Sequence, residues 1–157
     1  TPRTTSYRAC TVDIFSTLAE AANLPATSML QPQDGLSLFP LFNRDIKKRS
    51  KPLFFHHRNR GVVIDGDLKL ISQEGKFEQF NLADDDEETR DLYDETNPTS
   101  LRLKEIYLQW KQTLETSRSG KDYPEGQVAQ NQPERRFWKD DPAYQPHLER
   151  FQQNVNQ

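Results

Sequence analysis

The chain has 157 residues and a formal net charge of −3, with 33% hydrophobic and 29% charged residues. A globular domain usually has roughly 45–50% apolar residues, counting Gly and omitting Tyr, so we expect a core that only part of the chain shares. No segment approaches the roughly 20 apolar residues of a membrane span. The single cysteine, Cys10, excludes a disulfide within the chain. The near-neutral charge argues against a nucleic-acid partner bound by charge alone.

The first predicted element is a helix over residues 12–23. Its apolar residues recur at spacings of three and four and therefore share one face. They are Val12, Phe15, Leu18, Ala19 and Ala22. Thr11 can cap the start of this helix, Asp13 favours the positive end of its dipole, and Asn23 and Pro25 end it.

A linker rich in Pro and Gln follows, and large apolar residues then crowd around Asp34-Gly35 and Pro40. They are Leu36, Leu38, Phe39, Leu41 and Phe42. We expect a loop followed by one short helical turn that fills an apolar hollow.

The middle of the chain is predicted to form β-strands. Residues 51–58 contain a short apolar run, and residues 61–72 contain two such runs around Asp65-Gly66. Asp-Gly between apolar runs is a strong hairpin signal, because both turn residues need a positive φ. The Glu74-Gly75 turn then leads to a further strand over residues 77–82.

The last predicted helix begins at Asn97-Pro98, which supplies an N-cap and a proline at the first position. Its apolar stripe consists of Leu103, Ile106, Tyr107, Trp110 and Leu114. Gly120 ends the helix, and the hairpin sheet is the layer that the stripe is expected to cover. The predicted fold class is therefore α+β: a small antiparallel β-sheet packed against one long C-terminal helix, with a helix before the sheet.

The chain after Gly120 is polar and rich in Pro, Gln and Asn, so we expect an extended tail, draped on a partner or loose. Its few large apolar residues are predicted to be point anchors: Phe137, Trp138, Tyr144 and Phe151.

The most cationic place in the predicted sheet is the end of its first strand, where His56-His57 is followed by Arg58 and Arg60. Adjacent strand residues point to opposite faces, so at most one of the two histidines can face a given site. An anionic ligand at this strand end is one interpretation. The other is a solvated edge of the kind that protects strand ends.

Other clusters favour structural interpretations. No base can be placed beside Cys10, so we expect a small buried residue. Asp84–Glu88 lacks the ligand spacing and central Gly of a calcium loop and is predicted to be a solvated turn, as is Asp140-Asp141. Arg135–Lys139 mixes cations with aromatic residues, and we expect a docking anchor rather than a site for single-stranded nucleic acid. With no phosphate loop, paired-Cys motif or Ser elbow, no active site can be assembled from this chain alone.

Segments of this chain, in their order, resemble the C-terminal part of the sulfatases. Asp13–Leu18 is similar to the helix near the end of their catalytic domain, and Asp34–Leu41 to the Asp-Gly-x-Ser-Leu segment that follows it. Segments 51–55 and 65–71 resemble the strands that open the C-terminal subdomain. Residues 78–92 resemble its "Glu-Leu-Tyr-Asp-Leu … Glu-Thr-x-Asn-Leu" stretch. The resemblance covers about residues 11–114.

The resemblance implies hydrolysis of sulfate esters by a formylglycine, made from a Cys/Ser-x-Pro-x-Arg motif, beside a calcium ion. Neither Pro nor Arg follows Cys10 at the required places. We therefore expect no catalytic residue, metal ligand or cofactor in this chain, and we expect the catalytic half to lie upstream. The implied partners are that catalytic domain and a sulfated carbohydrate or aryl sulfate. The implied location is periplasmic or secreted.

The resemblance also implies a division of the chain. Residues 1–50 are expected to be the end of the catalytic domain, 51–120 the C-terminal subdomain, and 121–157 the polar tail. Such a subdomain covers the catalytic domain and lends residues to the rim of the substrate pocket, for which His56, His57 and Arg58 are the candidates. The alternative is a free-standing module that binds anionic glycans at the cationic sheet edge.

Overall fold

The computed structural model describes residues 4–29, 31–122, 137, 140–144 and 146–148. The chain divides into two compact units, Thr1–Gly126 and Gln127–Gln157. In the second unit the Asp141 carboxylate accepts a hydrogen bond from the Ala143 N–H, which confirms the predicted polar turn at this point. Most of the predicted tail, including Trp138 and Phe151, lies outside the described residues.

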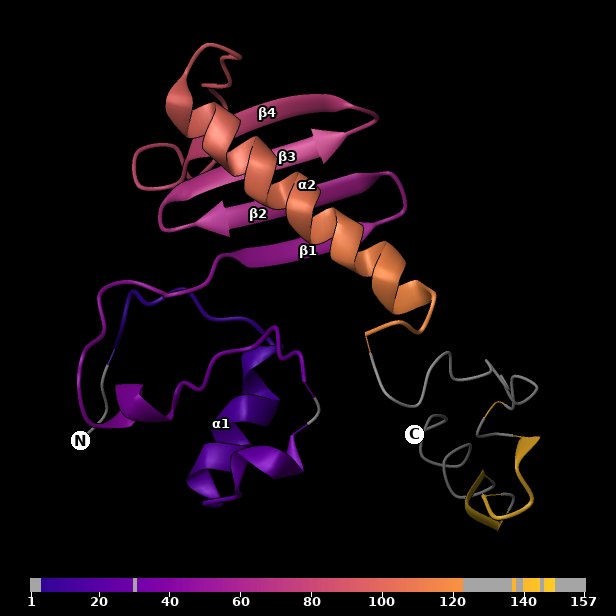
Figure 1. Ribbon diagram of the computed structural model, residues 1–157. Helices are drawn as coiled ribbons and strands as arrows, with labels where there is room; N and C mark the ends of the chain where they lie inside the picture. Colours follow the sequence, from indigo (N-terminus) through magenta and orange to yellow (C-terminus); the bar gives the residue numbers. More distant parts are fainter. Residues whose placement is uncertain (1–3, 30, 123–136, 138–139, 145, 149–157) are drawn as a thin grey trace, which may run out of the picture. The chain divides into compact units, whose positions relative to one another are not determined.

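The first unit contains a four-stranded sheet, one long helix and an N-terminal helical segment (Figure 1). Its elements in chain order are α1 (Asp13–Ala21), η1 (Ala26–Ser28), η2 (Phe39–Phe42), β1 (Leu53–His57), β2 (Arg60–Asp65), β3 (Leu68–Gln73), β4 (Lys76–Asn81) and α2 (Pro98–Arg118). The strands follow one another across the sheet in the order β1-β2-β3-β4, and each neighbouring pair is antiparallel. The predicted α+β class is confirmed.

Two-residue turns connect the strands. Asp65 pairs with Leu68, so the central residues of the β2–β3 turn are Gly66 and Asp67. Only Gly66 has a positive φ there, at 62°, and the prediction of a turn with positive φ at both Asp65 and Gly66 was wrong by one residue. The reason is that Asp65 is the last residue of β2 and still pairs with Leu68 of β3. Glu74 and Gly75 both have positive φ, at 52° and 84°, as a type I′ hairpin turn requires.

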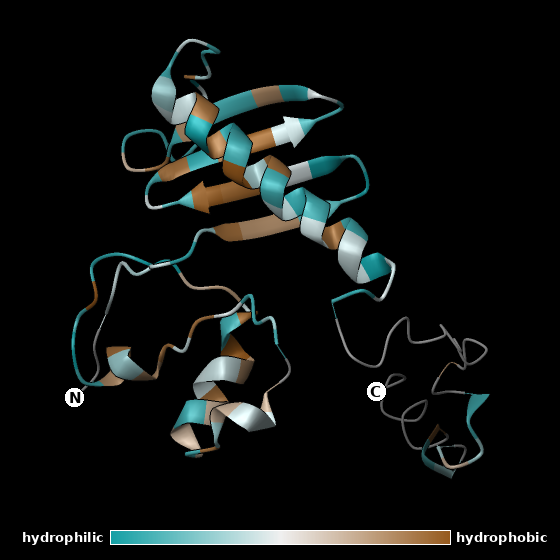
Figure 2. Ribbon diagram, viewed as in Figure 1, coloured by the Kyte–Doolittle hydropathy of each residue, from teal (hydrophilic) through white to brown (hydrophobic). Residues whose placement is uncertain are grey.

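α2 crosses one face of the sheet (Figure 1). Its residues Leu103 and Tyr107 form the buried core with Val63 and Leu70. Much of α2 is hydrophilic (Figure 2), and Ile106 and Trp110 pack against the core beside Leu103 and Tyr107, which confirms the predicted packing face. The predicted ends are confirmed too: the Asn97 side chain accepts from the Thr99 N–H, and Gly120 takes a φ of 67° just after the helix.

α1 packs through its polar side and not through the predicted apolar face. Asp13, Ser16 and Ala19 are buried, whereas Phe15 and Leu18 are 53% and 63% exposed. The reason is that the Asp13 carboxylate binds partners in the following loop, which turns the apolar stripe outward. Val12, and not Thr11, occupies the N-cap position, without a side-chain cap. The helix ends at Ala21, two residues before the predicted end, and Asn23, one of the two predicted stop residues, has a φ of 53°.

η2 is the predicted short helical turn. Its Phe39 and Phe42 rings pack edge to face with their centroids 5.5 Å apart. Phe42 is 62% exposed, so its ring does not fill an apolar hollow of this chain as predicted.

Candidate functional site

The three predicted rim residues lie at the end of the edge strand β1 but do not share one face. His56 is half-buried and stands opposite Gly61 on β2, on the face that α2 covers. His57 and Arg58 are exposed. Arg58 lies in the β1–β2 turn, where its backbone adopts a φ of 55°. The alternating burial along β1 is consistent with side chains on opposite faces, but it does not keep the two histidines from bordering a common hollow. Both still border an open hollow at the strand edge, together with Phe55 and Arg60.

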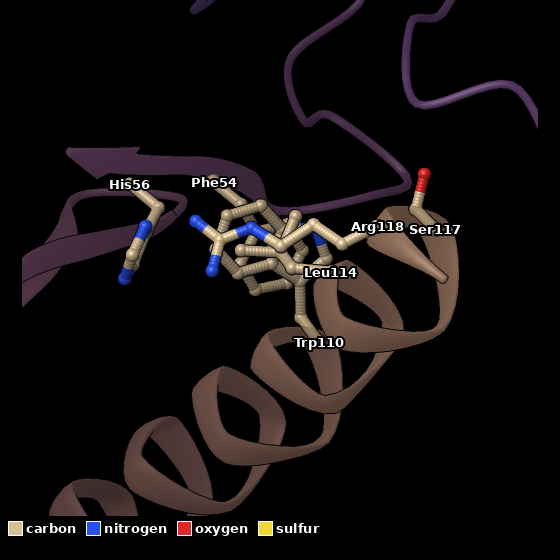
Figure 3. A pocket seen from close by; sticks show the side chains of 6 residues that line it. All are labelled: Phe54, His56, Trp110, Leu114, Ser117 and Arg118. Atoms are coloured by element: carbon tan, nitrogen blue, oxygen red, sulfur yellow. The ribbon is translucent and has the colours of Figure 1, made fainter. Parts of the chain in front are cut away.

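A groove lies between β1 and the last turns of α2, on the face to which His56 belongs (Figure 3). The Phe54 and Trp110 rings are stacked at a centroid distance of 4.8 Å and an angle of 12°. Leu114 continues this apolar floor. The Arg118 side chain extends from α2 toward His56, whereas the Ser117 hydroxyl points away (Figure 3). The groove has a volume of about 340 Å³.

Sequence reasoning assigned Trp110 only to the packing stripe and did not single out Arg118. A signal was available, because positions 110, 114 and 118 are spaced by four and lie on one helix face. The stripe that covers the sheet therefore runs past the edge strand and ends in a cation. The sequence could not show that the end of α2 extends past β1, because this depends on the angle at which α2 crosses the sheet.

Aromatic rings beside a guanidinium are suited to bind a ligand. Rings give a ligand a flat apolar contact, and a guanidinium supplies paired donors for an anionic group. Among the described residues, no group of three or more His, Cys, Asp or Glu is arranged to hold a metal ion. The half-buried Cys10 has its Sγ 3.8 Å from the Thr11 hydroxyl.

A second cluster of polar residues is structural and lies around Asp13. The Arg49 guanidinium donates two hydrogen bonds of 2.8 Å to its carboxylate. The backbone N–H groups of Leu36 and Cys10 donate two more, at 2.7 and 2.9 Å. Burial by itself raises the pKa of Asp13, but the Arg49 guanidinium and these N–H groups outweigh it and hold that pKa below its usual range. This cluster ties α1 to the segments that follow it.

The acidic run at residues 84–88 forms a turn, as predicted. The Asp85 carboxylate accepts from the backbone N–H groups of Thr89 and Arg90, which lowers the pKa of Asp85. Glu88 forms an ion pair with Lys69 of β3. Asp85 and Glu88, the two partly buried acids of the run, therefore both have partners. The other three, Asp84, Asp86 and Glu87, are exposed.

None of the helices that the structure describes is long and apolar enough to cross a lipid bilayer. No protein-family model and no curated protein matches this chain. Among solved structures, a crystal structure of Ps i-CgsB in complex with k-i-k-neocarrahexaose matches with a TM-score of 0.51 and 20% sequence identity.

That match covers 62% of this chain and 23% of the other one, so the chain spans about a quarter of the length of its structural neighbour. At this identity the likeness is one of fold. It agrees with the sulfatase resemblance of the sequence segments, and the fold of the chain is sulfatase-like.

Proposed function

We propose that this chain is the C-terminal portion of a sulfatase, which covers the catalytic domain and contributes to the rim of the substrate pocket. The observation that carries the proposal is the fold likeness to a much longer chain, of which this chain matches only 23%. The sulfatase-like order of sequence segments supports it independently.

The exposed apolar surface of α1 and η2 supports a missing partner domain. Its members are large hydrophobic residues of the two elements: Ile14 at 53% exposure, Phe15 at 53%, Leu18 at 63% and Phe42 at 62%. Leu24, which follows α1, is 51% exposed. Exposed apolar side chains that gather in one region favour an interaction site. We assign this surface to contact with the catalytic domain, whose end would include residues 1–50.

The substrate in this proposal is a sulfated carbohydrate or an aryl sulfate. The structural neighbour was solved with a neocarrahexaose bound, which favours the carbohydrate. His56, His57 and Arg58 remain the proposed rim residues, because their strand end is cationic and accessible. A periplasmic or secreted location follows from the sulfatase resemblance and is part of the same proposal.

The residues of this chain do not fit the formylglycine and calcium of the sulfatase family. Cys10 lacks the Pro and Arg of the modification motif. Its backbone N–H is used to bind Asp13, and the described residues contain no acidic ligand cluster. The chemistry of sulfate-ester cleavage would therefore belong to the upstream domain, and no catalytic step is assigned here.

The purified chain is expected to release no product from an aryl sulfate such as 4-nitrophenyl sulfate. The measurement is the absorbance of the nitrophenolate over several hours, with a Cys10→Ala variant assayed in parallel. Turnover by the chain that disappears in Cys10→Ala would contradict the proposal, because the nucleophile would then lie in this piece.

The groove of Phe54, Trp110, His56 and Arg118 favours a second candidate, a free-standing module that binds anionic glycans. Such a module would be monomeric and would need no partner over α1. The two candidates therefore differ in whether the exposed α1 surface makes the chain self-associate in solution.

A further inference from the structure

We propose that the groove between β1 and the end of α2 binds one anionic hexose unit of a polysaccharide, with its ring on Trp110 and its anionic group between Arg118 and His56. The inference deepens the proposed role in glycan binding and depends on the proposed function only for the class of ligand. Of the three predicted rim residues, only His56 lines this groove; His57 and Arg58 do not.

The aromatic floor is rigid and reachable. Phe54 and Trp110 hold each other in a stacked pair, so the Trp110 ring loses little freedom when a ligand binds. Trp110 borders three adjoining hollows of about 340, 190 and 230 Å³. The first is near the lower end of the range of small-ligand sites, about 300–1,000 Å³, which suits one sugar ring.

Arg118 and His56 lie at one end of that floor. Arg118 extends toward His56 (Figure 3), and its side chain is 65% exposed. Its ion pair with Glu115, at 3.3 Å, lies on the helix surface. Surface pairs of this kind are weak, so a ligand anion can take the place of Glu115. The planar guanidinium binds a carboxylate or sulfate through two donors at once.

The groove therefore combines an apolar contact for a ring with a charge for a substituent. Neither feature requires the sheet and helix to change shape. A hydrophobic ligand without charge would leave Arg118 and His56 unused, and a small anion alone would leave Trp110 uncovered. An anionic sugar satisfies both parts, whether its anion is a sulfate ester or a uronate carboxylate.

The test measures binding of three hexasaccharides to the whole 157-residue chain by calorimetry and tryptophan fluorescence. κ-Carrahexaose carries sulfate, hexagalacturonate carries carboxylate, and agarohexaose is neutral. Trp138→Phe removes the second tryptophan, so that the fluorescence reports on Trp110 alone. We expect saturable binding of at least one anionic sugar with a change in Trp110 emission.

Arg118→Gln should weaken that binding about tenfold, because one charge-assisted interaction is lost. The matched control is Arg102→Gln, an arginine of the same helix that pairs with Asp65 at 2.7 Å and does not line the groove. We expect it to change affinity by less than about twofold.

Preference for the sulfated or for the carboxylated sugar would support the proposal and identify the anion. Equal affinity for agarohexaose, equal losses in the two arginine variants, or no saturable binding would overturn it. None of these results bears on the nitrophenyl sulfate assay. Conversely, Cys10-dependent turnover would contradict the proposed function and leave the binding measurement unaffected.

Discussion

At the scale of single residues, Asp13 determines how the N-terminal segment is held. Its carboxylate is fully buried and binds Arg49 and two backbone N–H groups. A buried carboxylate costs free energy unless its charge is paired and its oxygens are hydrogen-bonded, and both conditions are met here. Gly35 makes the close approach possible, because a Cβ at that position would lie 2.0 Å from the Val12 carbonyl oxygen.

Asp13→Asn is expected to lower the free energy of unfolding by about 3 kcal/mol, because it leaves the Arg49 charge buried without its partner. Urea denaturation measures this change, and faster amide exchange at Leu36 should accompany it. The matched control is Asp67→Asn, which breaks an exposed pair with Arg8 and should cost less than about 1 kcal/mol. Equal losses in both variants would show that the cluster is not structural.

The dependence of stability on pH tests the role of the Asp13 carboxylate a second time. The pKa of Asp13 is lowered in the folded chain, so its contribution is fully present above the unfolded pKa of about 3.9. That contribution is lost as the pH falls through the lower, folded pKa. Below about pH 4 the wild type should therefore lose more stability than Asp13→Asn does, and parallel curves for the two proteins would argue against this assignment.

At the scale of elements, the contact between α2 and the sheet depends on one small residue. Gly61 of β2 is buried, and a Cβ there would lie 2.1 Å from the Tyr107 hydroxyl oxygen and 2.4 Å from a ring carbon. Tyr107 is only 2% exposed, so its ring has little room to move. This absence of a side chain lets the middle of α2 approach the strands closely.

Gly61→Ala is expected to destabilise the chain by about 1–3 kcal/mol through overpacking. Thermal and urea unfolding measure the loss. Tyr107→Leu removes the obstructing ring, so in that background the added cost of Gly61→Ala should fall clearly below its cost in the wild type. Additive effects of the two substitutions would mean that the contact does not limit how closely α2 packs.

At the scale of the whole molecule, the low hydrophobic content acquires a structural meaning. The sheet and α2 bury a compact core of their own, whereas α1 and η2 expose large apolar side chains. An exposed patch of this kind should bind a hydrophobic dye or associate with another copy in solution. The proposed catalytic domain would cover it in a longer protein.

Phe15→Ser and Leu18→Ser together should reduce both dye fluorescence and self-association, with little change in stability, because both side chains are more than half exposed. Analytical ultracentrifugation and dye titration measure the effect. Leu108→Ser is the matched control, since Leu108 is 46% exposed on α2. A wild-type chain that stays monomeric and binds no dye would instead favour the free-standing module.

Much of the fold could be read from the sequence because local signals agreed with the final structure. The Asn97 cap, the proline after it and the spacing of the apolar stripe defined α2. The Glu74-Gly75 turn and alternating strands defined the sheet. Hairpin turns and helix caps depend on a few neighbouring residues, so sequence is sufficient for them.

The sequence misled where long-range pairing decided the outcome. The apolar stripe of α1 predicted its buried face, but Arg49, 36 residues further along, binds Asp13, and the buried face is the adjacent one that contains Asp13, Ser16 and Ala19. The β2–β3 turn moved by one residue because strand pairing continues to Asp65. Neither the Asp13–Arg49 pair nor the Asp65–Leu68 pair could be predicted from the residues next to it in the sequence.

The order and spacing of residues by themselves determined that this chain has one modest α+β core and a polar tail. Only the tertiary structure decided which residues form a site. It separates His56 from His57 and brings His56 together with Trp110 and Arg118, which lie more than fifty positions away. The physical reason is that residues on a strand and on a helix meet only through the crossing angle of the two elements, which the packing of Tyr107 on Gly61 constrains.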